Sequence, residues 1–503
     1  MISLDLKNLK KIREVDARLM SYNVEMTEIT GGTFWKAYTP GQIAGTEEFK
    51  VSGGLGNFTA MADLMQYYPP INLYDEKLRK LAKALGPVWV RVSGSWATKT
   101  YYDFDGTTGG KAPEGYQSVL TREEWIGVLD FVKAIGAKLL ISVSNCAGDH
   151  KDGGPLDLTQ TKKIFNLSHE YGVDIDAAEF MNEPSMLEMS GAPRGYTPAD
   201  YARDQDIFNA WVKENYPNCL LVGPCSLGDG TMGDKEAEEK NKGAGIGNMT
   251  QICTTHDLLR GTEVKLDVFS YHYYNGISER LASIMPAGHW PAEMAHTDRY
   301  LAVAPDNARA YLPIRDKYVP GGQIWVTESG DAGGGGDTWA STYLDVFRTL
   351  NELGSFATLT DGVIFHNTLA SSDYGFLKHG SFEPRPNYFA VLLWNTLMGT
   401  TVYDCGNPGV EGAHVYCHSR KDGKAGAAYL VINNSLENET EINLESDAEA
   451  YVLDAENLRS SFMRLNGKEL KLGEGNEIPA LTSVKAEKGS FKLAPGSCAF
   501  FVV

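Results

Sequence analysis

The order of apolar and polar residues divides the chain into two regions. In the first region, short apolar runs of strand length alternate with segments of helical period, a pattern typical of parallel strands joined by helices. Eight strand-like runs occur, at residues 19–26, 88–92, 138–144, 173–181, 219–222, 266–271, 323–327 and 362–365. Helical segments are expected at residues 75–85, 121–135, 198–214, 249–259, 293–317, 338–353 and 386–398. This alternation predicts an α/β protein with a closed (β/α)₈ barrel.

The second region, from about residue 399, has a different pattern. Short alternating runs such as residues 427–432 and 441–444 are separated by Asn, Gly and Glu, which is typical of an all-β sandwich. Residues 2–6 also alternate, and nothing in the barrel needs them. We therefore expect a barrel over residues 16–398 and a β-sandwich domain formed by residues 1–15 together with 399–503.

A long connection, residues 27–70, follows the first barrel strand and is predicted to be a loop. It is rich in glycine and carries five aromatic residues: Phe34, Trp35, Tyr38, Tyr67 and Tyr68. So many aromatics argue against disorder. They either form a wall for a ligand or pack the loop, and the sequence favours neither.

Composition and charge restrict the possible partners. The 503 residues are 43% apolar and 22% charged, as in ordinary folded domains, and 46 basic against 65 acidic residues give a net charge of −19. An acidic surface repels polyanions, so we expect neither nucleic acid nor membrane partners; the oligomeric state is left open. No apolar stretch has the length of a signal peptide core or a spanning helix, which predicts a cytoplasmic location for the chain as given, or a secreted or periplasmic one if a leader has been removed.

The seven cysteines lack a Cys-x-x-Cys pair, so we expect neither a zinc knuckle nor a redox motif. We expect the cysteines to be buried free thiols.

Two glutamates end predicted strands. Glu183 lies in Asn-Glu-Pro directly after the fourth run, and Glu328 ends the seventh, ahead of four glycines at residues 333–336. Strands four and seven lie on different sides of a closed barrel, so the two carboxylates face each other across its mouth. Such a pair is the minimum equipment for glycoside hydrolysis, with one acid and one nucleophile. Glu179 lies inside the fourth strand and is interpreted as a paired or barrel-lining carboxylate.

Several stretches, in matching order along nearly the whole chain, resemble glycoside hydrolase family 79, the heparanase and β-glucuronidase family. Besides the two glutamates, residues 90–95 are similar to the family's Arg-x-Gly-Gly stretch and residues 270–276 to its His-x-Tyr-Tyr segment. Residues 381–388 and 465–470 complete the series. The first of these stretches departs from the family, because it reads Arg-Val-Ser-Gly and one additional residue precedes Thr98. The excised basic segment of mammalian heparanases has no counterpart after Asp105.

The resemblance implies a retaining mechanism with Glu183 as general acid/base and Glu328 as nucleophile. It implies that Asn182 holds the sugar 2-hydroxyl and that His272 and Tyr274 orient the nucleophile. The uronate carboxylate would be bound by backbone amides of Gly334 and Gly335 and by Tyr374. Glycine lets main-chain N–H groups approach an anion closely, which suits a protein that is itself acidic.

The expected function is therefore cleavage of β-linked glucuronic acid, with no metal or cofactor and with a glucuronide or a glucuronic-acid-containing glycan as the partner. The net charge of −19 and the long loop favour exo-β-glucuronidase action. Three alternatives remain open: heparanase-like endo-cleavage of heparan sulfate, a related barrel glycosidase that acts on neutral sugars, and a carbohydrate-binding barrel without turnover.

Overall fold

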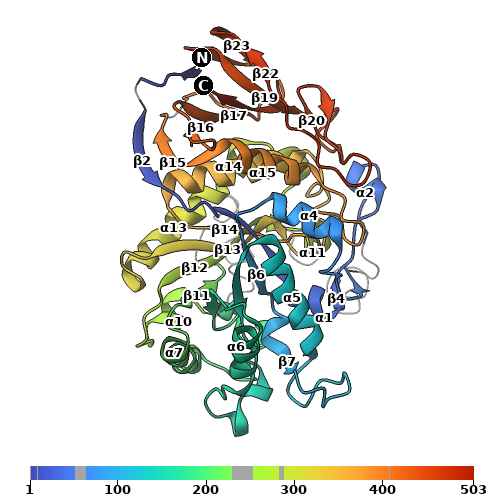
Figure 1. Ribbon diagram of the computed structural model, residues 1–503, viewed down its shortest axis with the longest axis vertical. Coiled ribbons are helices and arrows are strands. Elements are labelled where there is room, and N and C mark those ends of the chain that lie inside the picture. Colours follow the sequence, from blue (N-terminus) through green and yellow to red (C-terminus); the bar gives the residue numbers. More distant parts are fainter. Residues whose placement is uncertain (1, 8, 51–63, 229–252, 283–287, 407) are drawn as a thin grey trace.

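The computed structural model describes residues 2–7, 9–50, 64–228, 253–282, 288–406 and 408–503. In Figure 1 an α/β barrel forms the lower part of the molecule and twisted β-sheets form the upper part, where both chain ends lie.

Eight parallel strands close the barrel, as predicted. In chain order they are β3 (Met20–Glu25), β6 (Trp89–Ser93), β9 (Lys138–Ser142), β10 (Ala177–Glu179), β11 (Leu220–Ser226), β12 (Val268–Ile277), β13 (Gln323–Gly333) and β14 (Ile364–His366). β14 pairs with β3 and completes the ring. Each strand lies within or overlaps one of the apolar runs identified in the sequence.

The helices between these strands agree less closely with the sequence pattern. They are α1 (Met26–Thr30), α4 (Glu76–Ala84), α5 (Arg122–Ile135), α6 (Thr159–Tyr171), α7 (Pro198–Asn215), α10 (Thr255–Leu259), α11 (Glu279–Ala282), α12 (Asp298–Leu301), α13 (Val303–Tyr318), α14 (Leu344–Leu359) and α15 (Pro386–Leu397). The start of the helix expected at residues 249–259 lies outside the described residues. In the described part of the chain, no helix has both the length and the apolar character needed to cross a bilayer.

Three differences have physical causes. Helix α6 was not predicted because part of its buried face is polar, with Gln160, Thr161 and Ser168 in contact with the core. The segment 293–317 divides into α12 and α13, and Pro305 lies in the first turn of α13, where a missing N–H costs nothing. Helix α14 begins at Leu344 rather than residue 338, because the N–H groups of Tyr343 and Leu344 donate to backbone carbonyls of the β-sandwich.

The prediction of one long loop over residues 27–70 is wrong for its described part. β4 (Gly32–Trp35) and β5 (Met65–Tyr68) pair as an antiparallel hairpin, and α2 (Pro40–Ala44) follows β4. Residues 51–63 lie outside the described part. A second small sheet, β7 (Thr100–Asp103) with β8 (Ser118–Thr121), is parallel.

The upper part of the molecule consists of two sheets. The larger contains β2 (Lys10–Glu14), β15 (Met398–Asp404), β16 (Ala413–Arg420), β17 (Ala427–Asn433), β24 (Ser497–Val502), β19 (Ala448–Asp454), β20 (Arg464–Leu465), β21 (Lys468–Glu469) and β22 (Val484–Ala486). The smaller contains β1 (Ile2–Leu4), β18 (Thr440–Leu444) and β23 (Gly489–Leu493). Apolar side chains from both sheets form a separate core between them.

The barrel interior changes from apolar to polar along the strands. Apolar side chains from seven of the eight strands build a base that includes Trp89, Trp325 and Phe365, and β3 contributes none. Two residues further along the same faces, Arg91 and Ser270 are inward and polar. Because inward positions recur every second residue, this change of character places charged groups above a packed floor.

Tyr343, just before α14, connects the barrel to the sandwich. Its ring is buried, and its hydroxyl oxygen lies 2.9 Å from the carbonyl oxygen of Leu453 and 3.1 Å from that of Gly496. Both acceptors belong to the sandwich domain, so one side chain from the barrel satisfies polar groups at the junction.

Replacing Tyr343 by Phe should lower the free energy of unfolding by about 1–3 kcal/mol, because buried carbonyl groups lose their donor while the ring remains. Urea unfolding followed by far-UV circular dichroism measures the change. Tyr67→Phe, at a residue that is 66% exposed, is the matched control and should leave the midpoint unchanged. Equal midpoints for the two variants would contradict a role for Tyr343 at the junction.

Candidate active site

The structure brings the predicted site residues to one end of the barrel. Asn182 and Glu183 follow β10, His272 and Tyr274 lie in β12, Glu328 lies in β13, and Tyr374 follows β14. Most of them line a cavity of about 490 Å³ together with Phe34 and Trp35 of the β4–β5 hairpin. Gly334 also lines the cavity. Two of the predicted residues, His272 and Gly335, do not, and both are buried next to it.

A β-bulge aims Glu328 into the barrel. Tyr271 of β12 pairs with Val326, but the next residue, His272, pairs with Glu328, so Thr327 is the additional residue. Strict alternation from the inward Trp325 would have turned Thr327 inward and Glu328 outward. The carbonyl of Thr327 accepts a hydrogen bond from Asn23 Nδ2 at 3.1 Å, which holds the bulge from β3, two strands away in the barrel.

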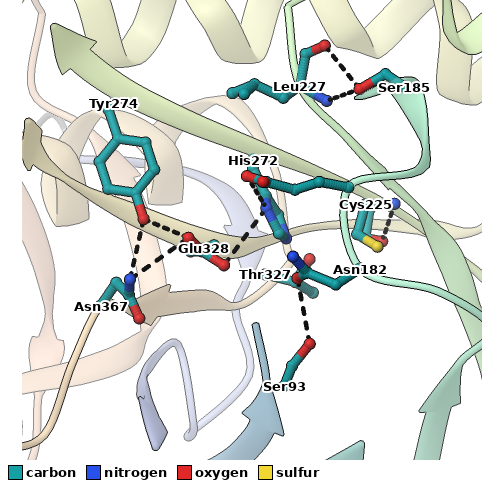
Figure 2. A network of polar contacts seen from close by, with 12 residues as sticks. Ser93, Asn182, Ser185, Cys225, Leu227, His272, Tyr274, Thr327, Glu328 and Asn367 are labelled. Atoms are coloured by element: carbon teal, nitrogen blue, oxygen red, sulfur yellow. Dashed lines mark hydrogen bonds and ion pairs between the residues drawn. The ribbon is translucent and has the colours of Figure 1, made fainter. Parts of the chain in front are cut away.

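Glu183 has a backbone conformation that is uncommon for its residue type. Its φ of 45° and ψ of 54° are left-handed, and Pro184 follows it. A non-glycine residue at positive φ is held by its surroundings, and such residues gather at functional sites. Two contacts with the end of β11 hold the chain on either side of Glu183. Ser185 and Leu227 exchange two hydrogen bonds, and the Cys225 thiol donates to the Met181 carbonyl at 2.9 Å (Figure 2).

Arg91 of β6 lies at the centre of the polar interior and has no exposed surface. Its Nε donates to Glu179 at 2.9 Å, one terminal nitrogen lies 3.3 Å from a Glu328 oxygen, and the other donates to Asn182 Oδ1 at 2.8 Å. The interpretation of Glu179 as a paired, barrel-lining carboxylate is confirmed. Glu179 is fully buried, whereas Glu183 and Glu328 each retain 8% exposure, so of these three carboxylates Glu183 and Glu328 are the two that can meet a substrate.

His272 lies between the two exposed carboxylates. Its Nε2 is 3.2 Å from an Arg91 nitrogen that can only donate, so Nε2 is the acceptor and Nδ1 carries the proton. The Nδ1 atom lies 3.0 Å from Glu183 and 3.5 Å from Glu328. Burial lowers the pKa of His272 to about 4, so the ring is neutral at physiological pH and acts as a hydrogen-bond donor.

Two residues contact the second oxygen of Glu328. The Tyr274 hydroxyl donates to this oxygen, and Asn367 Nδ2 lies 3.4 Å from it (Figure 2). Asn367 Nδ2 also lies 3.0 Å from the Tyr274 hydroxyl and 3.1 Å from that of Tyr374. Burial raises the pKa of Tyr274 well above its usual value, so it remains a donor. The carboxylate is thus held in one orientation by donors on both of its oxygens.

Three further residues belong to this site, although the sequence predicted no role for them: Arg91, Asn367 and Glu25. Glu25 ends β3 and lines the cavity, and burial, with the nearby Glu328 charge, raises its pKa well above the usual value. Arg91 had a signal, since a lone charge inside the apolar run of residues 88–92 is a charge that needs a partner. Glu25 and Asn367 had a weaker one: each is a polar residue at the end of a barrel strand.

Two groups of possible metal ligands occur among the described residues: Glu179 with Cys225 and His272, and Glu183 with His272 and Glu328. Both groups adjoin the Arg91 guanidinium, which already contacts Glu179, Glu328 and His272. A metal ion there would be repelled by this fixed cation, so the arrangement suits a pair of reacting carboxylates better than a metal centre.

The chain is similar to named enzymes over most of its length. It is 27% identical to heparanase-like protein 1 of Arabidopsis thaliana over 482 residues, covering 85% of this chain and 83% of that one. It is 34% identical to baicalin-β-D-glucuronidase of Scutellaria baicalensis over 185 residues, 35% of each chain. The solved structure of a 4-O-α-L-rhamnosyl-β-D-glucuronidase from Fusarium oxysporum superposes with a TM-score of 0.62 at 13% identity, covering 99% of this chain and 98% of that one, which shows a common fold.

No family model matches the chain. The similarity to heparanase-like and glucuronidase sequences nevertheless includes a relative matched over more than four-fifths of both chains, and the fold is that of barrel glycosidases with an additional β-domain. The chain is therefore similar over most of its length to proteins named as heparanase-like, in agreement with the resemblance to glycoside hydrolase family 79.

Proposed function

We propose that this protein is a retaining exo-β-glucuronidase in which Glu328 is the nucleophile and Glu183 the general acid/base. The observation that carries the proposal is the spacing of the two glutamates, which have carboxylate oxygens within 4.8 Å of each other. Retaining glycosidases hold their carboxyl groups about 5–5.5 Å apart, whereas inverting enzymes leave about 6.5–9.5 Å for a water molecule.

In the first step, Glu328 attacks the anomeric carbon as Glu183 gives its proton to the departing glycosidic oxygen. The products are the free aglycone and an ester between the sugar and Glu328. Burial raises the pKa of Glu183 to about 7, with the Arg91 charge acting against this effect. About half of the Glu183 side chains are therefore protonated at pH 7, which supplies the general acid that this step requires.

In the second step, Glu183 removes a proton from water, and the resulting hydroxide attacks the anomeric carbon and releases Glu328. Formation of the ester has removed the negative charge of Glu328, which favours the carboxylate form of its neighbour. The Tyr274 hydroxyl and Asn367 amide hold the Glu328 oxygen that is not reacting, so the nucleophile returns to the same position.

The substrate class follows from the other residues of the cavity. Gly334 and Tyr374 line it beside Glu328, and we assign them, with Gly335, to the uronate carboxylate. Asn182 Oδ1 already accepts from Arg91, so its amide nitrogen is assigned to the sugar 2-hydroxyl. The names of relatives, which include baicalin-β-D-glucuronidase and a hyaluronoglucuronidase of Hirudo nipponia, support a glucuronic-acid substrate.

Exo action is favoured by the charge of the cavity. Among the described lining residues, Lys99 is the single lysine or arginine, against the three glutamates Glu25, Glu183 and Glu328. A long sulfated chain would need basic side chains along its path. The aromatic hairpin residues Phe34 and Trp35 form part of the wall of this cavity.

The first test is a panel of 4-nitrophenyl β-glycosides. The glucuronide should be hydrolysed with a kcat/KM roughly 100-fold or more above that of the glucoside or xyloside. A neutral sugar leaves the hydrogen-bond donors of a carboxylate site without an acceptor. An aryl glucuronide should also exceed a heparan sulfate oligosaccharide. Preference for a neutral glycoside would refute the substrate class, and faster internal cleavage of the oligosaccharide would refute exo action.

Glu328→Gln should reduce kcat for the aryl glucuronide by roughly 10⁴-fold or more, because the amide cannot form the ester. Glu188→Gln, an exposed change on the segment after Glu183, is the matched control and should retain activity. With the wild-type enzyme, NMR should detect the β-anomer of glucuronic acid first. Release of the α-anomer, or turnover by Glu328→Gln, would show that the roles are assigned wrongly.

The pH profile of kcat/KM should fall on the basic side with an apparent pKa of about 7, as Glu183 loses the proton that it must donate. In Glu183→Gln this limb should disappear. Residual activity of that variant should depend steeply on the leaving group, with 2,4-dinitrophenyl glucuronide affected least because its phenolate needs no protonation. An unchanged basic limb in Glu183→Gln would assign the proton donor to another residue.

A further inference from the structure

Each carbonyl of the glycine run at the end of β13, residues 333–336, accepts a hydrogen bond. Ser278 N donates to the first at 2.9 Å and Ser278 Oγ to the second at 2.9 Å, while Asp373 N donates to the third at 3.0 Å. The Tyr38 hydroxyl donates to the fourth at 3.2 Å.

The amide side of the same run is different. Within the described chain, the N–H groups of Gly334 and Gly335 have no hydrogen-bond acceptor. Both residues have a φ near 90°, and Gly336 continues at 82°. A Cβ at Gly335 would lie 2.6 Å from Trp35 Cβ, so the run cannot carry side chains. With every carbonyl occupied, the unpaired amides are the groups left for an anion.

Arg280 of α11 is the residue that joins this run to the rest of the site. Its side chain has no exposed surface, and one terminal nitrogen donates to Gly334 O at 3.1 Å and Gly336 O at 2.8 Å. Its Nε and other terminal nitrogen both donate to Lys36 O, at 2.9 and 2.6 Å. The guanidinium also lies 3.7 Å above the centre of the Tyr38 ring.

The same guanidinium is ion-paired with Asp373, which precedes Tyr374 in the loop after β14. Asp373 also accepts from Tyr38 N at 3.3 Å, and its own N–H holds Gly335 O. One planar, five-donor group therefore fixes the glycine run and, through Asp373, the loop that carries Tyr374. These are the two arms of the assigned carboxylate site, reached from different barrel strands.

We propose that Arg280 is the positioning residue of the carboxylate subsite, setting the spacing between the amides of Gly334 and Gly335 and the hydroxyl of Tyr374. This inference rests on the proposed function, since it explains how that site selects a uronate. Arg280 does not touch the sugar. It acts on selectivity through the peptide groups that it holds, and the positive charge is balanced by Asp373 rather than offered to the ligand.

Lysine cannot replace this group. Its three N–H donors are all on one nitrogen, whereas the guanidinium uses three nitrogens to reach the carbonyls of Lys36, Gly334 and Gly336. Arg280→Lys should lower the ratio of kcat/KM for 4-nitrophenyl glucuronide to that for the glucoside about 10-fold, mainly through a higher KM. Arg280→Gln, which also removes the charge, should lower it about 100-fold. The glucoside value itself should change by less than about threefold.

The matched control is Arg348→Lys. Arg348 of α14 is equally buried and is paired with Asp345 and Glu352, and it is absent from the cavity lining. Thermal unfolding is recorded for all variants. Arg348→Lys should lose stability and keep the substrate ratio, whereas Arg280→Lys should lose the ratio, which a merely structural role would not produce.

The outcomes separate the two proposals. A wild-type enzyme without preference for the glucuronide would overturn the proposed function, and this inference with it. If the wild-type enzyme prefers the glucuronide and folded Arg280→Lys keeps the same ratio of kcat/KM values to within about twofold, the inference alone is overturned. If Arg280→Gln does not fold, the lysine variant decides, since it keeps the charge and the aliphatic stem.

Discussion

The site depends on one buried cation. Arg91 has no contact with solvent, and an unpaired charge in that position would cost several kcal/mol. Its partners come from other strands: Glu179 from β10, His272 from β12 and Glu328 from β13. The barrel can close without an isolated charge only when these strands bring their groups to the same level. The requirement that stabilises the fold therefore also fixes the tautomer of His272 and one oxygen of the nucleophile.

Much of this arrangement could be predicted from the sequence. The barrel strands are short apolar runs, so periodicity locates them, and the closed topology then places Glu183 and Glu328 on the same rim. The bulge at Thr327 could not be predicted, because it is a property of the pairing between β12 and β13 rather than of β13 alone. Alternation read within residues 325–328 would have turned Glu328 away from the interior.

The features that were missed depend on contacts between distant residues. The β4–β5 hairpin comes from a segment whose glycine content suggested a loop, and its strands gain stability by pairing with each other. Arg280 lies in an ordinary polar segment, and its importance comes from carbonyls more than 50 residues later in the chain and from Lys36 near its beginning. Local pattern has no information on such partners, whereas the charge of Arg91 inside an apolar strand was a visible sign.

The pairing of β2 with β15 has a consequence for the order of folding. Val402 pairs with Arg13, so a single ladder joins segments that are separated in the chain by the entire barrel. On a ribosome the first strands emerge long before their partners, and the ladder forms only after the barrel has brought its own ends together. The sandwich can therefore be completed only after the barrel has folded and brought β2 next to β15. Until then, β1 and β2 have unpaired edges that could pair with another chain. Rapid folding of the barrel shortens the time for which these edges are exposed.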